Sequence, residues 1–437
     1  MKKSRFLMSS CKPFLSLERW KNLWQQQRWI RCGILALFFV LWARAIWSLY
    51  SNQGLFWLIG VDFAMLFTLS TAFWTADPST IYQIDTLNPI YQQLLSTYAH
   101  GYQYFDVALV PYPPLFAWMF TPFTMLPPLI GFALWEAILL LAALHLVWRA
   151  TQFFPGKEKA CAALLILTSY PIAYCLLVGN VQLLVACAIA ECYLSLRAGR
   201  DLRAGLWLSC VLIKPQYGFL LGLLLIWKFR WRAVAGALIG AVILFGGSFL
   251  VAGTAPLLGY ATTVSHYSGE KLRGLAVDHM TNFRSLVLYF HPDTSNLRGI
   301  LYMYILGGAT ILCAALAWRG PWDPRSPRFP TQMGVLLLAT LLATFYGYQA
   351  GASVLVVPIA SMLMEGHPNR LTRLSIMAGA ILPTLSFTLV NLLDVPVASR
   401  TLTLLLLASY GCLLAELWHA REPNQAPKIN EATKAWG

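Results

Sequence analysis

The sequence predicts an all-α polytopic membrane protein, with about 10–12 membrane helices and interfacial helices in its first outer loop. Hydrophobic residues make up 58% of the 437 residues and charged residues make up 11%. The mean hydropathy is +0.60. Soluble domains usually carry about 25% charged residues and lack repeated apolar runs of about 20 residues. The composition therefore places most of the chain in a lipid bilayer.

The distribution of basic residues predicts how the chain is oriented. The net charge is +14, yet no lysine or arginine occurs between Ala45 and Trp148, whereas residues 1–32 are strongly basic. Membrane proteins retain basic residues on the cytoplasmic side. We therefore expect a cytoplasmic N-terminus over 1–32. The remaining charge is spread over short loops, which fits contact with membrane lipids and argues against a nucleic-acid partner.

Apolar runs bounded by basic loops predict ten spans. These are 33–52, 129–149, 160–178, 181–196, 233–252, 299–317, 331–348, 351–365, 374–391 and 399–418. Between 197 and 232, the apolar sequence is broken at Lys214-Pro215-Gln216, which is typical of a hairpin of two short helices. The membrane domain then covers 33–418, and residues 419–437 form a polar cytoplasmic tail.

Two outer segments, 53–128 and 253–297, are the only sizeable polar surface that the sequence predicts. In the first, residues 61–75 predict a helix that lies on the membrane. Five prolines interrupt residues 107–127, which favours an interfacial or re-entrant helix over a span. Any chemistry on polar substrates is therefore expected at the outer face.

Asp62 is the leading candidate for chemistry in the first outer segment. It lies about ten residues beyond the first span and begins the apolar run that ends at Trp74. An aspartate before a helix can simply cap the free N–H groups. A carboxylate at the membrane surface can also accept a proton from an acceptor hydroxyl. The sequence leaves both interpretations open.

Two cations interrupt apolar sequence. Arg44 lies inside the first span, where it can bind a carboxylate or phosphate or extend toward the interface. Lys214 precedes Pro215, where it can bind a phosphate as a point charge or lie at the membrane surface. The amides of Gln182 and Gln216 lie near turning or broken helices, where they can bind sugar hydroxyls or backbone groups.

The second outer segment holds the densest polar cluster outside the predicted spans. Its members are His266, Glu270, Lys271, Arg273, Asp278, His279, Asn282 and Arg284. A basic cluster at this depth suits a phosphate headgroup, although a solvated loop is the alternative. The chain has no HExxH motif, P-loop, GxGxxG fingerprint or GxSxG elbow. We therefore expect neither a metal nor a cofactor, and the sequence does not support ATP-driven transport or serine hydrolase chemistry.

Four stretches, taken in order, carry a resemblance to a known family. They are Gly60-Val61-Asp62-Phe63, then Tyr112-Pro113-Pro114-Leu115 with Pro122 and Leu126-Pro127, then Gly179-Asn180-Val181-Gln182 with Lys214-Pro215-Gln216, and finally Asn282-Phe283-Arg284-Ser285-Leu286. Their order and spacing resemble the polyprenol-phosphate-sugar-dependent glycosyltransferases of the GT-C fold. The closest resemblance is to glycosyltransferase family 87, and it covers most of the membrane core.

The resemblance implies a GT-C-like membrane domain in the bacterial inner membrane, with Asp62 as the catalytic base at the outer face. The donor would be a polyprenyl-phosphate-linked hexose, most often mannose, and the acceptor a lipid or a glycan. The expected substrate-binding residues are Arg44, Tyr112, Gln182, Lys214, Gln216, His266, Arg273, His279, Asn282, Arg284, Tyr348 and Gln349. Family members often carry an acidic or histidine residue near the start of the later span pair, whereas the stretch 346–351 has neither.

Two other classes of function remain open at this point. A secondary transporter or flippase of a lipid-linked or anionic substrate would suit the broken helix at Lys214 and the intramembrane Arg44. A membrane scaffold would not need polar residues within its spans. Convergence of Asp62, Arg44 and Lys214 on one outward pocket would favour a transferase. Polar groups at mid-membrane between two similar halves would favour a transporter.

Overall fold

The computed structural model describes residues 56–57, 60–100, 111–268, 280–290, 297–366, 368–390 and 395–419. Within these ranges the chain is almost entirely helical. The exceptions are loops and two short antiparallel strands, β1 (Phe56–Trp57) and β2 (Ala99–His100), with Phe56 opposite His100. The predicted all-α class is confirmed.

The described helices fall into a first group before residue 128 and a larger bundle after it. The first group is α3 (Val61–Thr75), α4 (Ile84–Tyr98), α5 (Pro114–Met119) and α6 (Thr121–Thr124). The larger group is α7 (Pro128–Thr151), α8 (Gly156–Leu167), α9 (Tyr170–Val178), α10 (Gln182–Arg197), α11 (Asp201–Cys210), α12 (Phe219–Trp227), α13 (Trp231–Ala252), α14 (Thr254–Ser268), α15 (Phe283–Phe290), α16 (Leu297–Ala317), α17 (Phe329–Ala343), α18 (Val356–Glu365), α19 (Arg370–Val390) and α20 (Val395–His419). Three short 3-10 helices complete the described part: η1 (Val211–Ile213), η2 (Pro215–Tyr217) and η4 (Gln349–Leu355).

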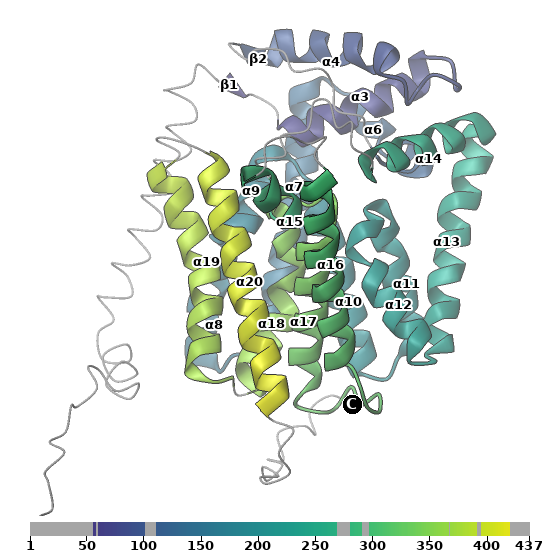
Figure 1. The fold of residues 1–437 in the computed structure, drawn as a ribbon. Coiled ribbons are helices and arrows are strands. Elements are labelled where there is room, and N and C mark those ends of the chain that lie inside the picture. The colour runs from purple at the N-terminus through teal and green to yellow at the C-terminus, as the bar shows by residue number, and fades with distance from the viewer. Residues whose placement is uncertain are drawn as a thin grey trace, which may run out of the picture.

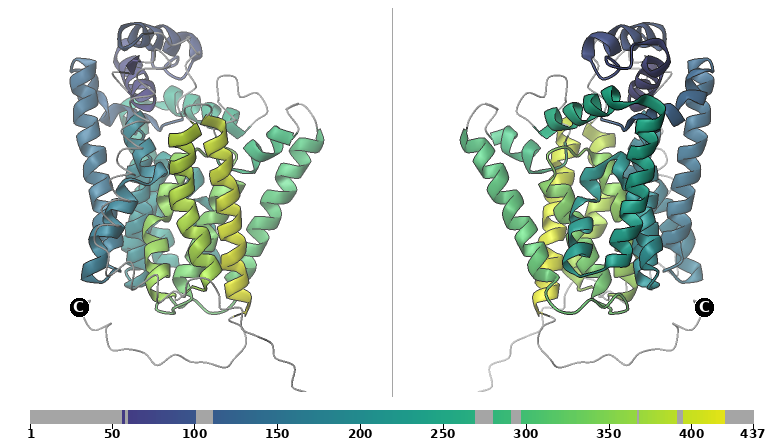
Figure 2. Two further views of the ribbon diagram at one scale, coloured as in Figure 1. Left: turned by 90° about the vertical axis from the view of Figure 1, so that its left-hand side faces the viewer. Right: turned by 90° about the vertical axis from the view of Figure 1, so that its right-hand side faces the viewer.

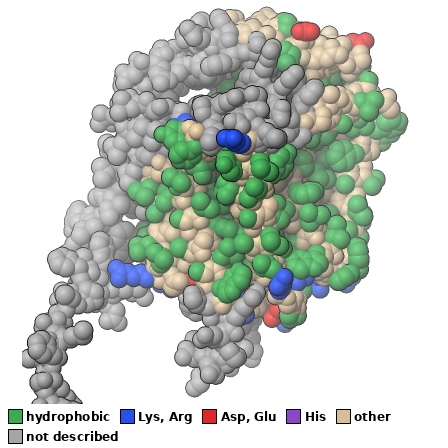
Figure 3. Space-filling view, viewed as in Figure 1, with side chains coloured by type: hydrophobic (Ala, Val, Ile, Leu, Met, Phe, Trp, Pro, Cys, Tyr) green, Lys and Arg blue, Asp and Glu red, His purple; other side chains and the backbone are tan. Residues whose placement is uncertain are grey.

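Most of the long helices run roughly parallel, while α3, α4 and α14 lie across one end of them (Figure 1). Figure 2 shows from two further sides that α3 and α4 stand beyond this end of the bundle, which we call the α3 end. The surface fits a membrane protein. Hydrophobic side chains cover the middle of the face in Figure 3, and lysine and arginine side chains gather mainly near the edge opposite the α3 end.

Three described helices are long and apolar enough to cross a membrane: Pro128–Thr151, Trp231–Ala252 and Arg400–Trp418. A fourth span is possible if α8 and α9 are taken as one, although they bend by 48°. The predicted first span, 33–52, lies outside the described residues. The other predicted spans coincide with helices, but several of these are shorter than a full span, and residues 349–355 form η4 in place of an α-helix. The apolar composition therefore predicted the positions of these helices along the chain, but not their lengths.

The core of the bundle is built around α10 and α17. Nearly every side chain of these two helices is buried, including Tyr193 and Phe329, whose rings stack at a centroid distance of 6.0 Å. Helices buried on all sides by protein need not match the bilayer thickness, because other helices rather than lipid surround them. This burial explains why the short helices α10 and α17 have no clear amphipathic pattern.

Buried ion pairs join the helices toward the end opposite α3. The Glu191 carboxylate of α10 accepts hydrogen bonds from Arg149 Nε at 2.5 Å and Nη2 at 2.9 Å, and His145 Nε2 lies 3.0 Å from its Oε1. Arg197 of α10 also pairs with Glu365 of α18, although the Glu365 side chain is partly exposed. A buried charge must be paired to be tolerated. The ion pairs therefore explain why these charged residues can lie within the bundle.

Candidate active site

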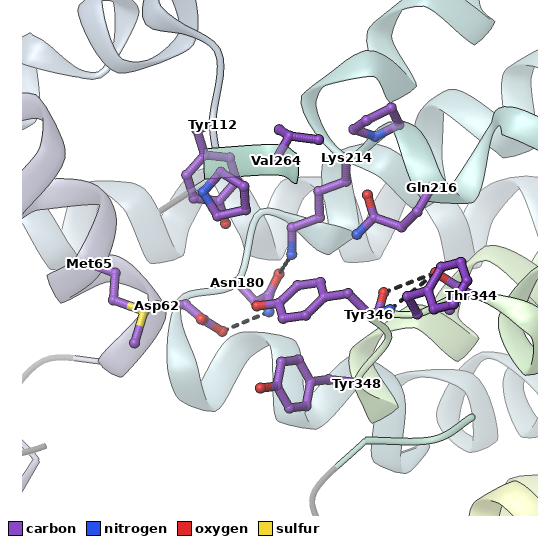
Figure 4. Close-up of a pocket in the computed structure, with 13 residues that line it drawn as sticks. Asp62, Met65, Tyr112, Asn180, Lys214, Gln216, Val264, Thr344, Tyr346 and Tyr348 are labelled. Atoms are coloured by element: carbon purple, nitrogen blue, oxygen red, sulfur yellow. Dashed lines mark hydrogen bonds between the residues drawn. The ribbon is translucent and has the colours of Figure 1, made fainter. Parts of the chain in front are cut away.

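One pocket, with a volume of about 180 Å³, lies at the α3 end of the bundle. Its walls come from α3, the segment around Tyr112, the α9–α10 turn, the break between α11 and α12, α14, and the loop after α17. Asp62 and Lys214 both line it, and Figure 4 shows them on either side of Asn180. The pocket therefore gathers residues that lie far apart in the sequence.

The start of α3 places Asp62 in this pocket. The helix is capped by Gly60, and Asp62 lies in its first turn without capping a backbone N–H. A side chain at Gly60 would not fit, since a Cβ there would lie 2.4 Å from the carbonyl carbon and oxygen of Val178. The absence of a side chain lets α3 begin directly against the end of α9. The capping role considered for Asp62 is therefore not what the structure shows.

The turn between α9 and α10 positions Asn180. Gly179 adopts a left-handed conformation with φ of 70°, and the Asn180 N–H donates to the Cys175 carbonyl at 2.8 Å. Trp135 of α7 fixes the turn from the other side by donating from Nε1 to the Gly179 carbonyl at 2.8 Å. Such a left-handed glycine is a common way to end a helix. Here it turns the Asn180 side chain toward α3.

Asn180 hydrogen-bonds to both charged residues of the pocket. Its Nδ2 donates to Asp62 Oδ2 at 2.6 Å, and its Oδ1 accepts from Lys214 Nζ at 2.9 Å. The same Oδ1 also accepts from the backbone N–H of Gln182 at 2.8 Å. Asp62 and Lys214 form no direct ion pair among those found in the described residues. The amide thus separates the carboxylate from the ammonium group.

Lys214 reaches the pocket because the hairpin breaks at this residue. Lys214 adopts φ of −135° and ψ of 76° between η1 and η2, and Pro215 follows it. A proline disfavours helical geometry in the residue before it. The ammonium group lies 5.9 Å from the centre of the Tyr112 ring, close enough for a cation–π contact. The predicted broken hairpin is therefore present, and its break carries the lysine.

Burial shifts the protonation of both charged residues. Desolvation raises the pKa of Asp62, although the nearby Lys214 and the Asn180 hydrogen bond act in the opposite direction. Desolvation likewise lowers the pKa of Lys214, opposed by Asp62. A carboxylate with a raised pKa is a stronger base than one in water. The pocket therefore combines a carboxylate of increased basicity with a nearby cation.

Tyrosine rings form another wall of the pocket. Tyr346 and Tyr348 meet edge to face with ring centroids 5.2 Å apart, and both line the cavity. Across from them, the Tyr112 carbonyl accepts a hydrogen bond from the buried Tyr82 hydroxyl at 2.6 Å. Aromatic side chains present apolar faces together with polar hydroxyl groups. Such a wall suits a ligand that, like a sugar ring, is apolar on one face and polar at its edge.

The structure brings together five of the predicted site residues. These are Asp62, Tyr112, Lys214, Gln216 and Tyr348, all of which line the pocket. Gln182 and Gln349 are fully buried and are not among its lining residues. Gln349 Nε2 lies 3.3 Å from the Tyr170 hydroxyl. The two buried glutamines therefore lie behind the site.

Asn282 and Arg284 of the second outer segment do not line the pocket themselves, but they adjoin residues that do. Asn282 holds the start of α15, accepting from the Ser285 N–H at 3.1 Å and donating to the Thr344 carbonyl at 3.0 Å. Arg284 of α15 is only 9% exposed, and no acidic partner for it is found in the described residues. Arg44, Arg273, His279 and the side chain of His266 lie outside the described residues.

Asn180 and Tyr346 line the pocket but are not among the expected substrate-binding residues, although both lie in stretches of the sequence considered above. Asn180 stands beside Gln182 in a short turn between two apolar runs, and this position was the available signal. The described residues contain no group of three or more His, Cys, Asp or Glu side chains that could hold a metal ion.

Comparison with known proteins identifies the family. No curated protein and no solved structure matches the chain. The family model of glycosyltransferase family 87 matches residues 110–362. This match covers more than half of the chain and includes the lining residues Tyr112, Asn180, Lys214 and Tyr348. The chain therefore belongs to glycosyltransferase family 87 and is a membrane glycosyltransferase.

Proposed function

We propose that this glycosyltransferase moves a hexose, which we assign as mannose, from a polyprenyl-phosphate donor to a hydroxyl group of a lipid or glycan acceptor. The reaction takes place at the outer face of the bacterial inner membrane, with Asp62 as the general base. One observation carries the proposal: the Asp62 carboxylate and the Lys214 ammonium line the same pocket, each hydrogen-bonded to Asn180.

The chemistry is a single displacement at the anomeric carbon. The acceptor oxygen attacks that carbon while its proton passes to Asp62. The bond between the carbon and the phosphate oxygen breaks, and the lipid phosphate leaves with the electron pair. A positioned general base contributes about 10²–10⁴-fold to such a reaction. Because Asp62 Oδ2 is bound by Asn180, the other carboxylate oxygen is the one that accepts the proton.

Lys214 is the group that stabilises the leaving phosphate. Its ammonium has three donors, and one of them is used by Asn180 Oδ1. The others are free to meet the charge that develops on the phosphate oxygens, which is the general form of electrostatic catalysis. Arg284 supplies a second buried cation near this end of the bundle. We assign it, with Arg44 and Arg273, to phosphate binding.

The pocket admits a sugar headgroup but not the lipid that carries it. Its volume of about 180 Å³ is small, because sites for drug-sized ligands usually span roughly 300–1,000 Å³. The hexose would lie against Tyr346 and Tyr348, and the polyprenyl chain would extend into the bilayer beside exposed apolar helices such as α13. The bond between the sugar and the phosphate would then be cleaved at the depth of the lipid headgroups.

The alternative class, a transporter or flippase, has less support. Its expected signature is a polar site at mid-membrane between two similar halves. The pocket of Asp62 and Lys214 instead lies at the α3 end, where it is lined by residues of α3, α14 and the α9–α10 turn (Figure 4). Arg44, the third residue of the expected convergence, lies outside the described residues.

A donor panel tests the proposal. The full-length protein in liposomes is given a membrane lipid extract and one radiolabelled donor at a time: polyprenyl-phosphate mannose, polyprenyl-phosphate glucose or a nucleotide-linked mannose. We expect label in an extracted product with the polyprenyl-phosphate mannose and none with the nucleotide sugar. Transfer from the nucleotide sugar alone would contradict the donor class. Transfer from the glucose donor alone would contradict the choice of sugar.

A further inference from the structure

We infer that Asn180 is a positioning residue that holds Asp62 and Lys214 apart and aligns each of them for the reaction. The role of Asn180 in sugar transfer rests on the proposed function, but its effect on the titration of Asp62 does not. Asn180 is 4% exposed and makes three hydrogen bonds within the site. No other described side chain is bonded to both Asp62 and Lys214.

The orientation of the Asn180 amide is fixed by its neighbours. Two donors, the Lys214 ammonium and the Gln182 backbone N–H, converge on one end of the side chain at 2.9 and 2.8 Å. That end must be the oxygen, because an amide nitrogen has no acceptor. The nitrogen therefore faces Asp62 and donates to its carboxylate. An asparagine is required here, since an aspartate would offer Asp62 a second acceptor.

The arrangement leaves each charged group with one side free. Asp62 Oδ2 is occupied by Asn180, so the second carboxylate oxygen of this pocket-lining residue is the one left to accept a proton. A direct ion pair with Lys214 would lower the basicity of Asp62 and occupy donors that the phosphate needs. The neutral Asn180 amide between them hydrogen-bonds to both charged groups, but it shifts the pKa of each less than a direct ion pair would. Asn180 thus lowers the basicity of Asp62 less than a direct ion pair would, and it leaves donors of Lys214 available.

The first test measures Asp62 itself and requires no turnover. The carboxyl stretch of Asp62 is followed by infrared spectroscopy as a function of pH in the full-length protein, and it is identified by its loss in Asp62→Asn. Asn180→Asp retains the shape of the side chain, so it limits any loss of folding. Asn88→Ala, in α4 and outside the pocket lining, is the matched control.

We expect Asn180→Asp to raise the titration midpoint of Asp62 by about one pH unit or more, because two adjacent carboxylates cannot both ionise readily. Asn180→Ala should also raise the titration midpoint of Asp62, since it removes a hydrogen bond to the charged carboxylate. Asn88→Ala should leave the midpoint unchanged. An unchanged midpoint in folded Asn180→Asp would overturn the inference.

The second test links the same residue to transfer. In both Asn180 variants, kcat should fall and the acid limb of its pH profile should move with the infrared midpoint, while the donor KM changes less. A purely structural role would reduce the amount of folded enzyme without moving that limb. If the infrared midpoint shifts but wild type transfers no sugar from any donor, the proposed function fails and the control of Asp62 by Asn180 stands.

Discussion

Asp62 in α3 and Lys214 at the break between η1 and η2 are separated by about 150 residues of sequence, yet both line one pocket. Burial acts on them in opposite directions, because it disfavours whichever form is charged. It raises the pKa of Asp62 and lowers that of Lys214. The pH range in which both are charged is therefore narrower than in water, and under the proposed mechanism the active form is confined to this range.

The pH dependence of transfer follows from these two shifts. We expect kcat/KM to rise with pH through an acid limb above 3.8, the ordinary pKa of aspartate, as Asp62 loses its proton. It should fall through an alkaline limb below 10.5, the ordinary pKa of lysine, as Lys214 loses its charge. Lys214→Arg should remove the alkaline limb, because arginine stays protonated. Steady-state rates in buffered liposomes measure both limbs.

The contribution of Asp62 to stability has the opposite dependence on pH from that of a salt-bridged aspartate. Its folded-state pKa lies above the unfolded value, so the folded protein binds more protons between the two values. The contribution of Asp62 therefore becomes less favourable as pH rises through this range.

Some of these residues could be predicted from sequence and others could not. Asp62 and Lys214 stand out because each interrupts an apolar run, and a charge in such a place needs a reason. Asn180 belongs to a stretch that carries the family resemblance, but the sequence alone assigns it no role, because asparagine is common at turns between helices. Its role depends on which atoms approach it from α3 and the hairpin, and this depends on tertiary packing.

At the scale of elements, the site depends on close contact between the start of α3 and the end of α9. Gly60→Ala would place a methyl group 2.4 Å from the Val178 carbonyl. We expect this substitution to displace Asp62 from Asn180, to lower kcat/KM at least tenfold and to destabilise the fold by about 1–3 kcal/mol. Gly156→Ala is the control, since a Cβ there meets nothing within 4 Å. Transfer rates and thermal unfolding in detergent distinguish the two variants, and equal activity would contradict the role of this contact.

The bend between α8 and α9 shows what hydropathy cannot predict. Residues 160–178 read as one span, but the helices meet at 48°. Thr168 ends α8, and Ser169 caps α9, which contains Pro171 in its first turn. These small polar residues and the proline were the signal, but they hardly alter the mean hydropathy. Hydropathy averages over a window and therefore reports composition, not direction.

At the scale of the whole molecule, sequence was sufficient to predict the class. Apolar runs separated by basic loops predicted a polytopic helical protein, and the described helices agree with that class. The number of full spans was harder to predict, because helices such as α10 and α17 are surrounded by protein. Their lengths are set by neighbouring helices and not by the thickness of a bilayer.

The proposed orientation places the α3 end outside and the basic end inside. Ser79 lies in an exposed turn before α4, and Ser326 lies in the loop before α17. In intact cells, Ser79→Cys should react with a membrane-impermeant maleimide, whereas Ser326→Cys should react only after permeabilisation. Labelling is measured against the parent protein, which has its own cysteines. The reverse pattern would contradict an outward-facing pocket.

The central claim is that Asp62 is the base in glycosyl transfer, and a single-turnover comparison tests it most directly. Wild type, Asp62→Asn and Asp85→Asn are loaded with radiolabelled polyprenyl-phosphate mannose and mixed with acceptor. Asp85 is an exposed acid in the first turn of α4 and serves as the control. We predict that Asp62→Asn slows transfer by about 10²–10⁴-fold while donor binding persists, and that Asp85→Asn transfers at the wild-type rate. Equal rates for wild type and a folded Asp62→Asn would contradict the account.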